Sequence, residues 1–293
     1  MKQKTSYDAL ILEGGSLRCS FTAGVLDTFA AIGFRPFKSY YAVSAGSMAL
    51  TSFLSGQRRH FVDLALRLVE DSKFISFTAA FSDEGLMNLS RLAQVVKDES
   101  PIDWNAANQF IEGKKVHIVT TDFETGEAHY LSPQRENWIR SVLASSSLPL
   151  VTRGRLKLRN RWMFDGGYSD PIPLKKAIED GCANILVIRT RPRSVRVEQD
   201  TLDLIVSYIY RDNQALASLF QTWHTRYNQV VDLLEKEKEL NQSWNEIAPL
   251  HELKSDGYRI SKEDVLDDYH HGLERALEWI DQNLEKLYNQ DKT

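Results

Sequence analysis

The chain has 293 residues, of which 42% are hydrophobic and 26% charged, a composition typical of a globular protein and unlike that of a disordered or fibrous chain. Residues 191–293 carry 13 basic and 20 acidic side chains, and residues 1–190 carry 23 and 20, so neither part has the strong basic excess of a nucleic-acid-binding protein. The longest uncharged stretch, residues 39–57, is too polar for a membrane span, and no secretory signal is evident. Two cysteines are too few for a disulfide framework or a metal cluster, so we expect a cytoplasmic protein that binds no metal.

The first two-thirds of the sequence alternates short apolar runs with helix-like segments. Such alternation favours a mainly parallel sheet with helices on both faces. We therefore predict a three-layer α/β/α fold for residues 1–190. The expected strands are residues 7–12, 39–43, 115–121, 128–131, 162–164 and 185–189, and the expected helices include 20–32, 46–54 and much of 61–109.

The pattern changes after residue 193. Apolar side chains recur with a helical period between residues 216 and 234 and again between 266 and 287. Ser261 with Asp264 three residues later resembles a capping box. We expect residues 191–293 to form an acidic, all-helical appendage whose apolar stripes pack in a core. The predicted division is an α/β domain at 1–190 and a helical C-terminal region at 191–293.

Ser44 stands where a predicted strand turns into a helix, in the string Ala42-Val43-Ser44-Ala45-Gly46. A tight turn of this kind needs small neighbours, because the serine side chain must project from the sheet. The positive end of the following helix favours a developing alkoxide at this position. Ser44 is therefore a candidate nucleophile. The alternative is a serine that merely caps the helix.

Gly14 and Gly15 follow the first predicted strand. Successive glycines allow the main chain to turn its N–H groups to one side and form an anion-binding nest. Beside a nucleophile, such a nest is what an acyl-transfer intermediate needs as an oxyanion hole. The loop lacks the glycine spacing of a dinucleotide site and the Gly-Lys-Ser/Thr of a phosphate loop. A plain strand-to-helix turn is the alternative.

Asp165 precedes two glycines at the end of another predicted strand. This position exposes a carboxylate at the sheet edge where the Ser44 and Gly14 loops also lie. The alternative is an aspartate in a solvated turn.

The seven histidines fit a serine triad less well. Three of them precede Asp165 and four lie in the C-terminal region, so the order Ser, Asp, His of the α/β-hydrolases would need a base from the appendage. We expect these histidines to be structural or solvated. His270 and His271 beside Asp267 and Asp268 are expected to form a solvated acidic face and not a metal site.

Together these loops resemble the patatin-like phospholipases, a family of lipid acyl hydrolases. The resemblance extends from residue 8 to residue 190, with several independent motifs in the family's order, and the helical tail resembles the extension of a bacterial subgroup. The motifs are GGSLR at 14–18, FTAGVL at 21–26, VSAGS at 43–47, TDFETGE at 121–127, ASSSLP at 144–149 and DGG at 165–167.

The resemblance implies catalysis by a Ser–Asp dyad that uses neither histidine nor calcium nor any other cofactor. Carried over motif by motif, Ser44 is the nucleophile and Asp165 the base that takes its proton. Partial burial of Asp165 in an apolar cleft would raise its pKa and improve it as this base. The N–H groups of Gly14, Gly15 and Ser16 then hold the oxyanion.

The sequence departs from the family pattern at Ser16, Cys19 and Ala42, each of which stands where glycine is usual. Ser16 matters most, because a side chain there can narrow the nest or force a backbone angle that glycine tolerates better. No departure removes a reacting atom, so we expect an active enzyme.

Two residues are candidates for substrate binding. Arg18 follows the nest and is expected to pair with a phosphate of the substrate or with a nearby carboxylate. Phe77 belongs to the aromatic-rich stretch 74–81, which lines an acyl channel or packs in the core.

The leading hypothesis is a serine hydrolase that cleaves ester bonds of lipids or phospholipids through a covalent acyl-enzyme. Its expected partners are a lipid or acyl-ester substrate and, peripherally, a membrane surface, and no nucleic acid. Two alternatives stay open. One is a catalytically silent module that binds lipid or protein, and the other is an esterase or thioesterase for small soluble substrates.

Overall fold

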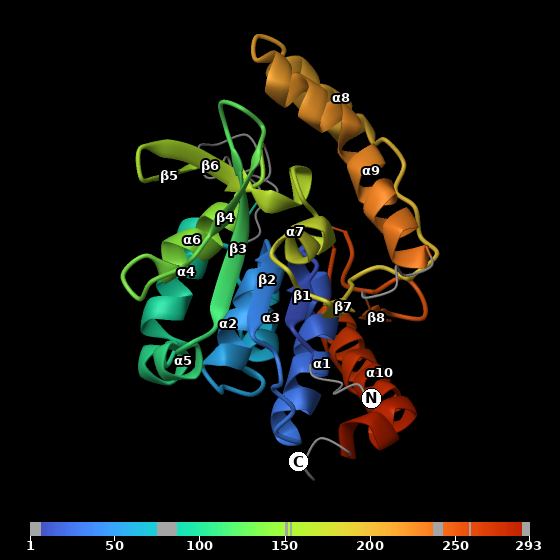
Figure 1. Ribbon diagram of the computed structural model, residues 1–293. Coiled ribbons are helices and arrows are strands. Elements are labelled where there is room, and N and C mark those ends of the chain that lie inside the picture. The colour runs from blue at the N-terminus through green and yellow to red at the C-terminus, as the bar shows by residue number, and fades with distance from the viewer. Residues whose placement is uncertain are drawn as a thin grey trace.

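The computed structural model describes residues 7–74, 87–149, 152, 154–236, 243–257 and 259–288, and Figure 1 shows their arrangement. One mixed sheet of eight strands runs through the centre of this described part. The strands are β1 (Ala9–Leu12), β2 (Ser39–Val43), β3 (Lys115–Asp122), β4 (Ala128–Leu131), β5 (Leu156–Leu158), β6 (Arg161–Asp165), β7 (Asn184–Ile188) and β8 (Ser243–Ile247).

The strand order is β5-β6-β3-β2-β1-β7-β8, with β4 also paired to β3. The five adjacent strands β3, β2, β1, β7 and β8 are parallel to one another. Strands β4 and β6 lie antiparallel to β3, and β5 lies antiparallel to β6. Leu12 at the end of β1 lies opposite both Ala42 and Ile188. The loops that follow β1, β2 and β7 therefore start side by side at one edge of the sheet, where ligands bind in open α/β folds.

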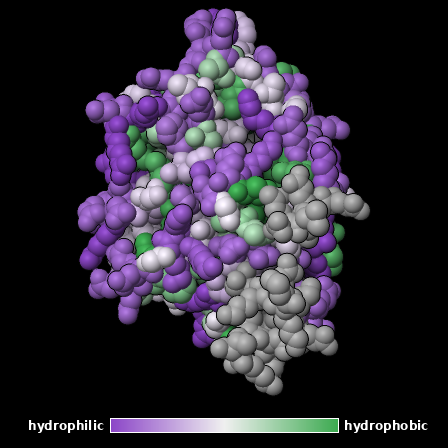
Figure 2. Space-filling view, in the orientation of Figure 1, coloured by the Kyte–Doolittle hydropathy of each residue, from purple (hydrophilic) through white to green (hydrophobic). Residues whose placement is uncertain are grey.

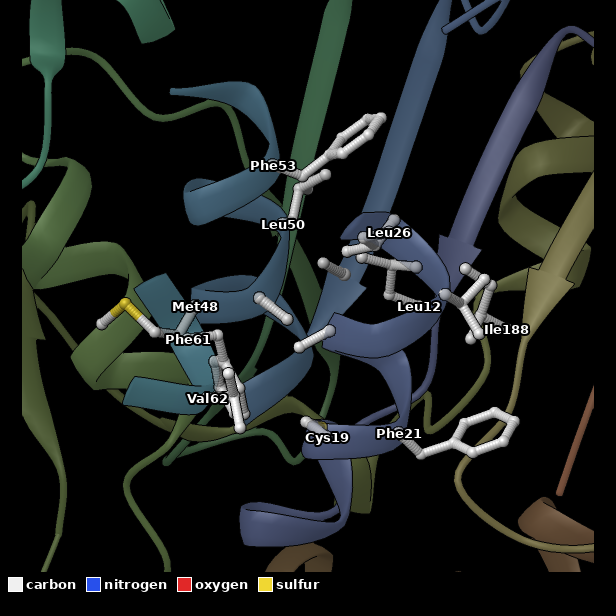
Figure 3. Packing of buried hydrophobic residues seen from close by; sticks show 14 of the residues in the cluster. Leu12, Cys19, Phe21, Leu26, Met48, Leu50, Phe53, Phe61, Val62 and Ile188 are labelled. Carbon is white, nitrogen blue, oxygen red and sulfur yellow. The ribbon is translucent and has the colours of Figure 1, made fainter. Parts of the chain in front are cut away.

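One face of the sheet carries the larger core. Leu10 and Leu12 of β1 point to this face and Ile11 to the other, so the strand is apolar throughout, as strands buried on both faces are. Figure 3 shows part of this packing, with Leu12 and Ile188 on strands of the sheet and Leu26 on a helix that covers them. The helices that contribute to this core are α1 (Cys19–Ala31), α2 (Ala45–Leu54), α3 (His60–Glu70), α4 (Leu89–Asp98), α5 (Trp104–Phe110), α6 (Trp138–Ser145) and α10 (Lys262–Tyr288).

The opposite face is covered by α7 (Leu174–Glu179) and α9 (Gln214–Glu235). Tyr227, Val231 and other apolar residues of α9 pack there against Ile11 and Val187. The remaining helix, α8 (Thr201–Ile209), joins α9 through Val206 in a smaller cluster around Phe220. Helices thus cover both faces of a sheet that is mainly parallel, and the predicted three-layer fold is confirmed.

The C-terminal region is mainly helical, but the prediction that residues 191–293 contain only helices is wrong at β8, which extends the sheet beside β7. Trp244 of β8 packs on one face of the sheet and Ile247 on the other, so the strand has no apolar–polar alternation for the sequence to reveal. In addition, α10 lies directly on α1 (Figure 1). A Cβ at Gly24 would lie 2.1 Å from the carbonyl oxygen of Tyr269, so only glycine allows the two backbones to approach this closely. The boundary at residue 190 stays a prediction.

Across the described ranges, no helix combines the length and the apolar character that crossing a bilayer requires.

Candidate active site

Ser44 lies in the turn between β2 and α2, in a strained conformation with φ 52° and ψ −134°. Such a conformation costs about 1–3 kcal/mol and persists where its surroundings enforce it. The N–H of Ser44 donates to Oγ of Ser145 at 2.7 Å, and that hydroxyl donates to the carbonyl of Val119 at 2.6 Å. Gly46 makes the turn sterically feasible, since a Cβ there would lie 2.7 Å from the carbonyl oxygen of Glu13. Of the small neighbours predicted for this turn, Gly46 is thus required by the packing.

The hydroxyl of Ser44 donates to Oδ2 of Asp165 at 2.7 Å. It makes no capping bond to α2, so the alternative of a simple helix cap does not describe it. Asp165 ends β6, and its Oδ1 accepts from the N–H of Gly167 at 2.8 Å. The sequence predicts a carboxylate exposed at the sheet edge, yet the residue is only 3% exposed. The structure therefore brings the two residues together in a buried pair.

Burial raises the pKa of Asp165 to about 6, although the hydrogen bonds from Ser44 and Gly167 lower it. The direction predicted from the sequence is confirmed. A carboxylate of higher pKa is a stronger base, and its proton affinity is better matched to a serine hydroxyl. The residue after Asp165 must be glycine for the chain to pack this closely against β3, since a Cβ at Gly166 would lie 2.3 Å from the carbonyl oxygen of Val119.

The glycine loop after β1 packs directly against this pair. A Cβ at Gly14 would lie 2.9 Å from Cβ of Ser44. Gly15 has φ 153° and Ser16 has φ 52°, so Ser16 does adopt the left-handed angle that glycine tolerates better. Among the described residues, no hydrogen bond is found to the N–H groups of Gly14, Gly15 or Ser16. These three N–H groups are candidates to hold an anion beside Ser44.

A buried ionic network fixes the position of this loop. The carboxylate of Glu13 accepts from the hydroxyl of Tyr227 and from the N–H of Thr190, both at 2.8 Å. Arg189, which is fully buried, places Nε 3.7 Å from Glu13 and donates from Nη2 to Tyr227 at 2.9 Å. The hydroxyl of Thr190 donates to the carbonyl of Gly14 at 2.6 Å. Because a buried charge without its partners is very costly, the network ties the loop to β7 and α9.

A cavity of about 500 Å³ begins at the Ser44–Asp165 pair and extends between the helices of the larger core. Its wall contains Phe74, the first residue of the aromatic-rich stretch, whereas Phe77 and Phe81 lie outside the described residues. The wall is largely apolar, as a site for an acyl chain must be. Its apolar residues include Met48, Phe61, Leu64, Leu68, Phe74, Met87, Leu89 and Leu92.

Arg18 lies at the wall of this cavity. Its Nη1 donates to Oδ2 of Asp256, 2.9 Å away in the connection between β8 and α10. Of the two partners expected for Arg18, the structure contains the carboxylate. Nε of Arg18 is buried and has no hydrogen-bond partner within the described part of the chain.

The histidines whose contacts the structure describes pack against groups other than Ser44 and Asp165. His60 lies between the hydroxyl of Ser52 at 2.8 Å and the carbonyl of Ser100 at 2.9 Å, and the ring of His251 stacks on that of His271 with centroids 4.4 Å apart. Within the described ranges, no group of three histidine, cysteine or carboxylate side chains could hold a metal ion. Cys19 is not a reactive thiol, since burial raises its pKa to about 12.

A sequence model of the patatin-like phospholipase family matches residues 10–178. The match covers more than half of the chain and includes Ser44, Asp165 and the glycine loop. The chain belongs to the patatin-like phospholipase family.

Two further comparisons involve individual proteins. This patatin-like chain is 30% identical over 230 residues to a protein of Escherichia coli strain K12 named uncharacterized protein YjjU. The aligned region covers 78% of this chain and 64% of YjjU. The chain thus spans less than two thirds of the length of that relative. A crystal structure of VipD from Legionella pneumophila superimposes with a TM-score of 0.47 at 10% identity, covering 94% of this chain and 67% of VipD.

The sequence of this family member does not predict the roles of several residues of the site. Ser145 lies in the motif at 144–149, but no sequence pattern predicts that its hydroxyl fixes the Ser44 turn. Glu13 and Arg189 each end an apolar run, and an ionic residue in that position signals a buried partner. Their pairing with Tyr227, and that of Arg18 with Asp256, joins segments far apart in the chain, so no local pattern could reveal it.

Proposed function

We propose that the protein is a serine acyl hydrolase that cleaves ester bonds of lipids, phospholipids among them, through a covalent acyl-enzyme. The observation that carries the proposal is the hydrogen bond of 2.7 Å between Ser44 and Asp165 at the end of an apolar cavity. Membership of the patatin-like phospholipase family supports it. The chemistry needs a nucleophile, a base and an anion-binding nest, and each has a candidate within this site.

In the proposed reaction, Asp165 takes the proton of Ser44 as Oγ attacks the carbonyl carbon of the ester. The N–H groups of Gly14, Gly15 and Ser16 stabilise the negative oxygen of the tetrahedral intermediate. Asp165 then returns the proton to the leaving alcohol as the carbon–oxygen bond breaks. A water molecule, deprotonated by Asp165, attacks the acyl-enzyme and releases the fatty acid, which restores the hydroxyl of Ser44.

The cavity sets the expected substrate class. We expect the acyl chain to lie along the apolar wall formed by α2, α3 and α4, where each buried methylene contributes about 0.8 kcal/mol. Arg18, which lines the cavity, is proposed to contact a phosphate of the substrate. Phe77 remains a proposed substrate contact on the basis of the sequence alone.

The test compares hydrolysis of p-nitrophenyl esters and of phospholipid in mixed micelles by the wild type, Ser44→Ala and Asp165→Asn. The matched control is Ser55→Ala, since Ser55 is a buried serine at the other end of the same helix whose hydroxyl only donates to the carbonyl of Ser52 at 3.0 Å. We expect both dyad variants to lose at least about a thousandfold in kcat, with the control unchanged. A folded wild type that hydrolyses neither substrate would favour the silent binding module, and hydrolysis of short esters alone would favour the small-substrate esterase.

A further inference from the structure

One face of α8 is exposed and apolar. Leu204, Ile205, Tyr208 and Ile209 are 47%, 49%, 68% and 47% exposed, and their spacing of one, three and four residues places them on a single side of the helix. The other side holds Val206, which is fully buried against α9. Single exposed apolar side chains are common, but an adjoining group of four marks an interaction surface.

A basic hairpin lies near this helix. The segment 154–161, which contains β5 and the start of β6, carries Arg155, Lys157, Arg159 and Arg161 and no acidic residue. All four are exposed. Arg161 is paired with Asp122 at 2.9 Å. Arg155, Lys157 and Arg159 are exposed on the same hairpin as Trp162, which is 38% exposed.

Phe123 connects the hairpin to the end of α8. The guanidinium of Arg155 lies 4.2 Å from the ring centre of Phe123 and 4.9 Å from that of Trp162. Phe123 in turn contacts the ring of Tyr210, the residue after α8, with centroids 5.4 Å apart. Figure 1 shows α8 and the β5–β6 hairpin at the same upper end of the molecule, and Figure 2 shows hydrophobic residues among hydrophilic ones towards that end.

The wall of the active-site cavity reaches both of these elements. The cavity is lined by Thr152, just before the hairpin, and by Leu202 of α8. Both α8 and the hairpin therefore adjoin the cavity that contains Ser44. We call these residues the docking surface: Leu204, Ile205, Tyr208, Ile209, Trp162, Arg155, Lys157 and Arg159.

We propose that the docking surface binds the surface of an anionic lipid bilayer, and this inference rests on the proposed lipid hydrolysis. The aliphatic side chains of α8 enter the boundary between head groups and acyl chains, and Tyr208 and Trp162 lie at the head groups. The hairpin cations are attracted to anionic lipids. Binding through this surface places the part of the cavity wall at Thr152 and Leu202 near the lipid.

The experiment measures co-sedimentation of the full chain with vesicles of phosphatidylcholine, with and without phosphatidylserine, in the Ser44→Ala background so that no lipid is consumed. One test variant is Ile205→Asp with Ile209→Asp, and the other is Lys157→Glu with Arg159→Glu. Leu250→Asp is the matched apolar control, since Leu250 is 67% exposed elsewhere. Arg58→Glu, at another exposed position, is the charge control. The same substitutions with Ser44 intact are assayed on a soluble p-nitrophenyl ester.

We expect binding to anionic vesicles that weakens as salt is raised, and that falls at least about tenfold in each test variant but not in the controls. Soluble ester hydrolysis should not change in any of them. Absence of vesicle binding, equal losses in the controls, or self-association through α8 in place of lipid binding would overturn the docking surface. If the wild type binds as expected but hydrolyses no ester, the proposed function fails and the docking surface stands.

Discussion

The raised pKa of Asp165 predicts opposite effects of Asp165→Asn on activity and on stability. Burial raises this pKa to about 6 in the folded protein, whereas an aspartate in the unfolded chain has a pKa of about 3.9. Below pH ~4 both states hold the proton and the residue has no effect on stability. As the pH rises from 4 to 6, the unfolded state ionises first, so the free energy of unfolding decreases. Above pH ~6 the full cost of the buried carboxylate is present.

The size of that cost follows from the shift. A difference of about two pKa units at about 1.4 kcal/mol each corresponds to about 3 kcal/mol at pH 8. The asparagine side chain carries no charge, so Asp165→Asn should recover most of this free energy at pH 8 and little of it at pH 4. For a chain of this size, such a gain raises the melting temperature by at least about 5 °C.

The same ionisation governs activity, because only the carboxylate can take the proton of Ser44. With a pKa of about 6, the ionised fraction falls from about nine tenths at pH 7 to about one tenth at pH 5, so kcat/KM should fall about tenfold over this range. Asp165→Asn should show no such activity at either pH.

Thermal unfolding and ester hydrolysis at pH 4, 5, 7 and 8 test both effects in one series. Asp170→Asn is the matched control: burial also raises the pKa of Asp170 to about 6, but its hydrogen bond comes from Tyr130 at 2.6 Å and not from Ser44. This variant should gain stability at pH 8 and keep its activity. A wild-type rate that is flat between pH 5 and pH 7, or an Asp165→Asn variant that is less stable than wild type at pH 8, would refute the reasoning.

Three further predictions concern the loop, the strand end and the cavity. Ser16→Gly removes the strain of the left-handed φ angle of 52°. In urea titrations it should raise the free energy of unfolding by about 0.5–1 kcal/mol, without slowing ester hydrolysis. A loss of stability would show that Ser16 is not strained. Gly166→Ala places a Cβ 2.3 Å from the carbonyl oxygen of Val119. It should lower the free energy of unfolding by about 1–3 kcal/mol and reduce the rate of ester hydrolysis. No change in either would show that the end of β6 is less tightly packed. Leu64→Trp fills part of the cavity and should lower kcat/KM for a dodecanoyl ester about tenfold relative to a butanoyl ester, because about two methylenes lose their site. Equal losses on both esters would argue against an acyl chain beside Leu64.

The part of the fold that could be predicted from the sequence is the part set by local patterns. The apolar runs that became β1, β2 and β7, and the helical period of α9, follow from periodicity alone. The turn at Ser44 could be predicted because a strand, a serine and small residues occur within five positions. β8 could not, since its two buried residues face opposite sides of the sheet.

The remaining features of the site depend on contacts between distant segments. Glu13 and Arg189 are 176 positions apart, and only the parallel pairing of β1 with β7 brings them together. Asp165 was expected at an exposed edge, but packing against β3 and Ser147 buries it. Burial of this kind is a property of the assembled layers, and the sequence of a single loop does not contain it.

The central claim is that Ser44 is the residue that becomes acylated and that Asp165 makes it reactive. The most direct measurement is peptide mass spectrometry after reaction with a fluorophosphonate, which forms a covalent adduct only with an activated serine. We predict an adduct on the peptide that contains Ser44 in the wild type, its loss in Ser44→Ala and a much slower reaction in Asp165→Asn. A folded wild type that takes up no label, or a label on another serine that survives Ser44→Ala, would contradict the claim.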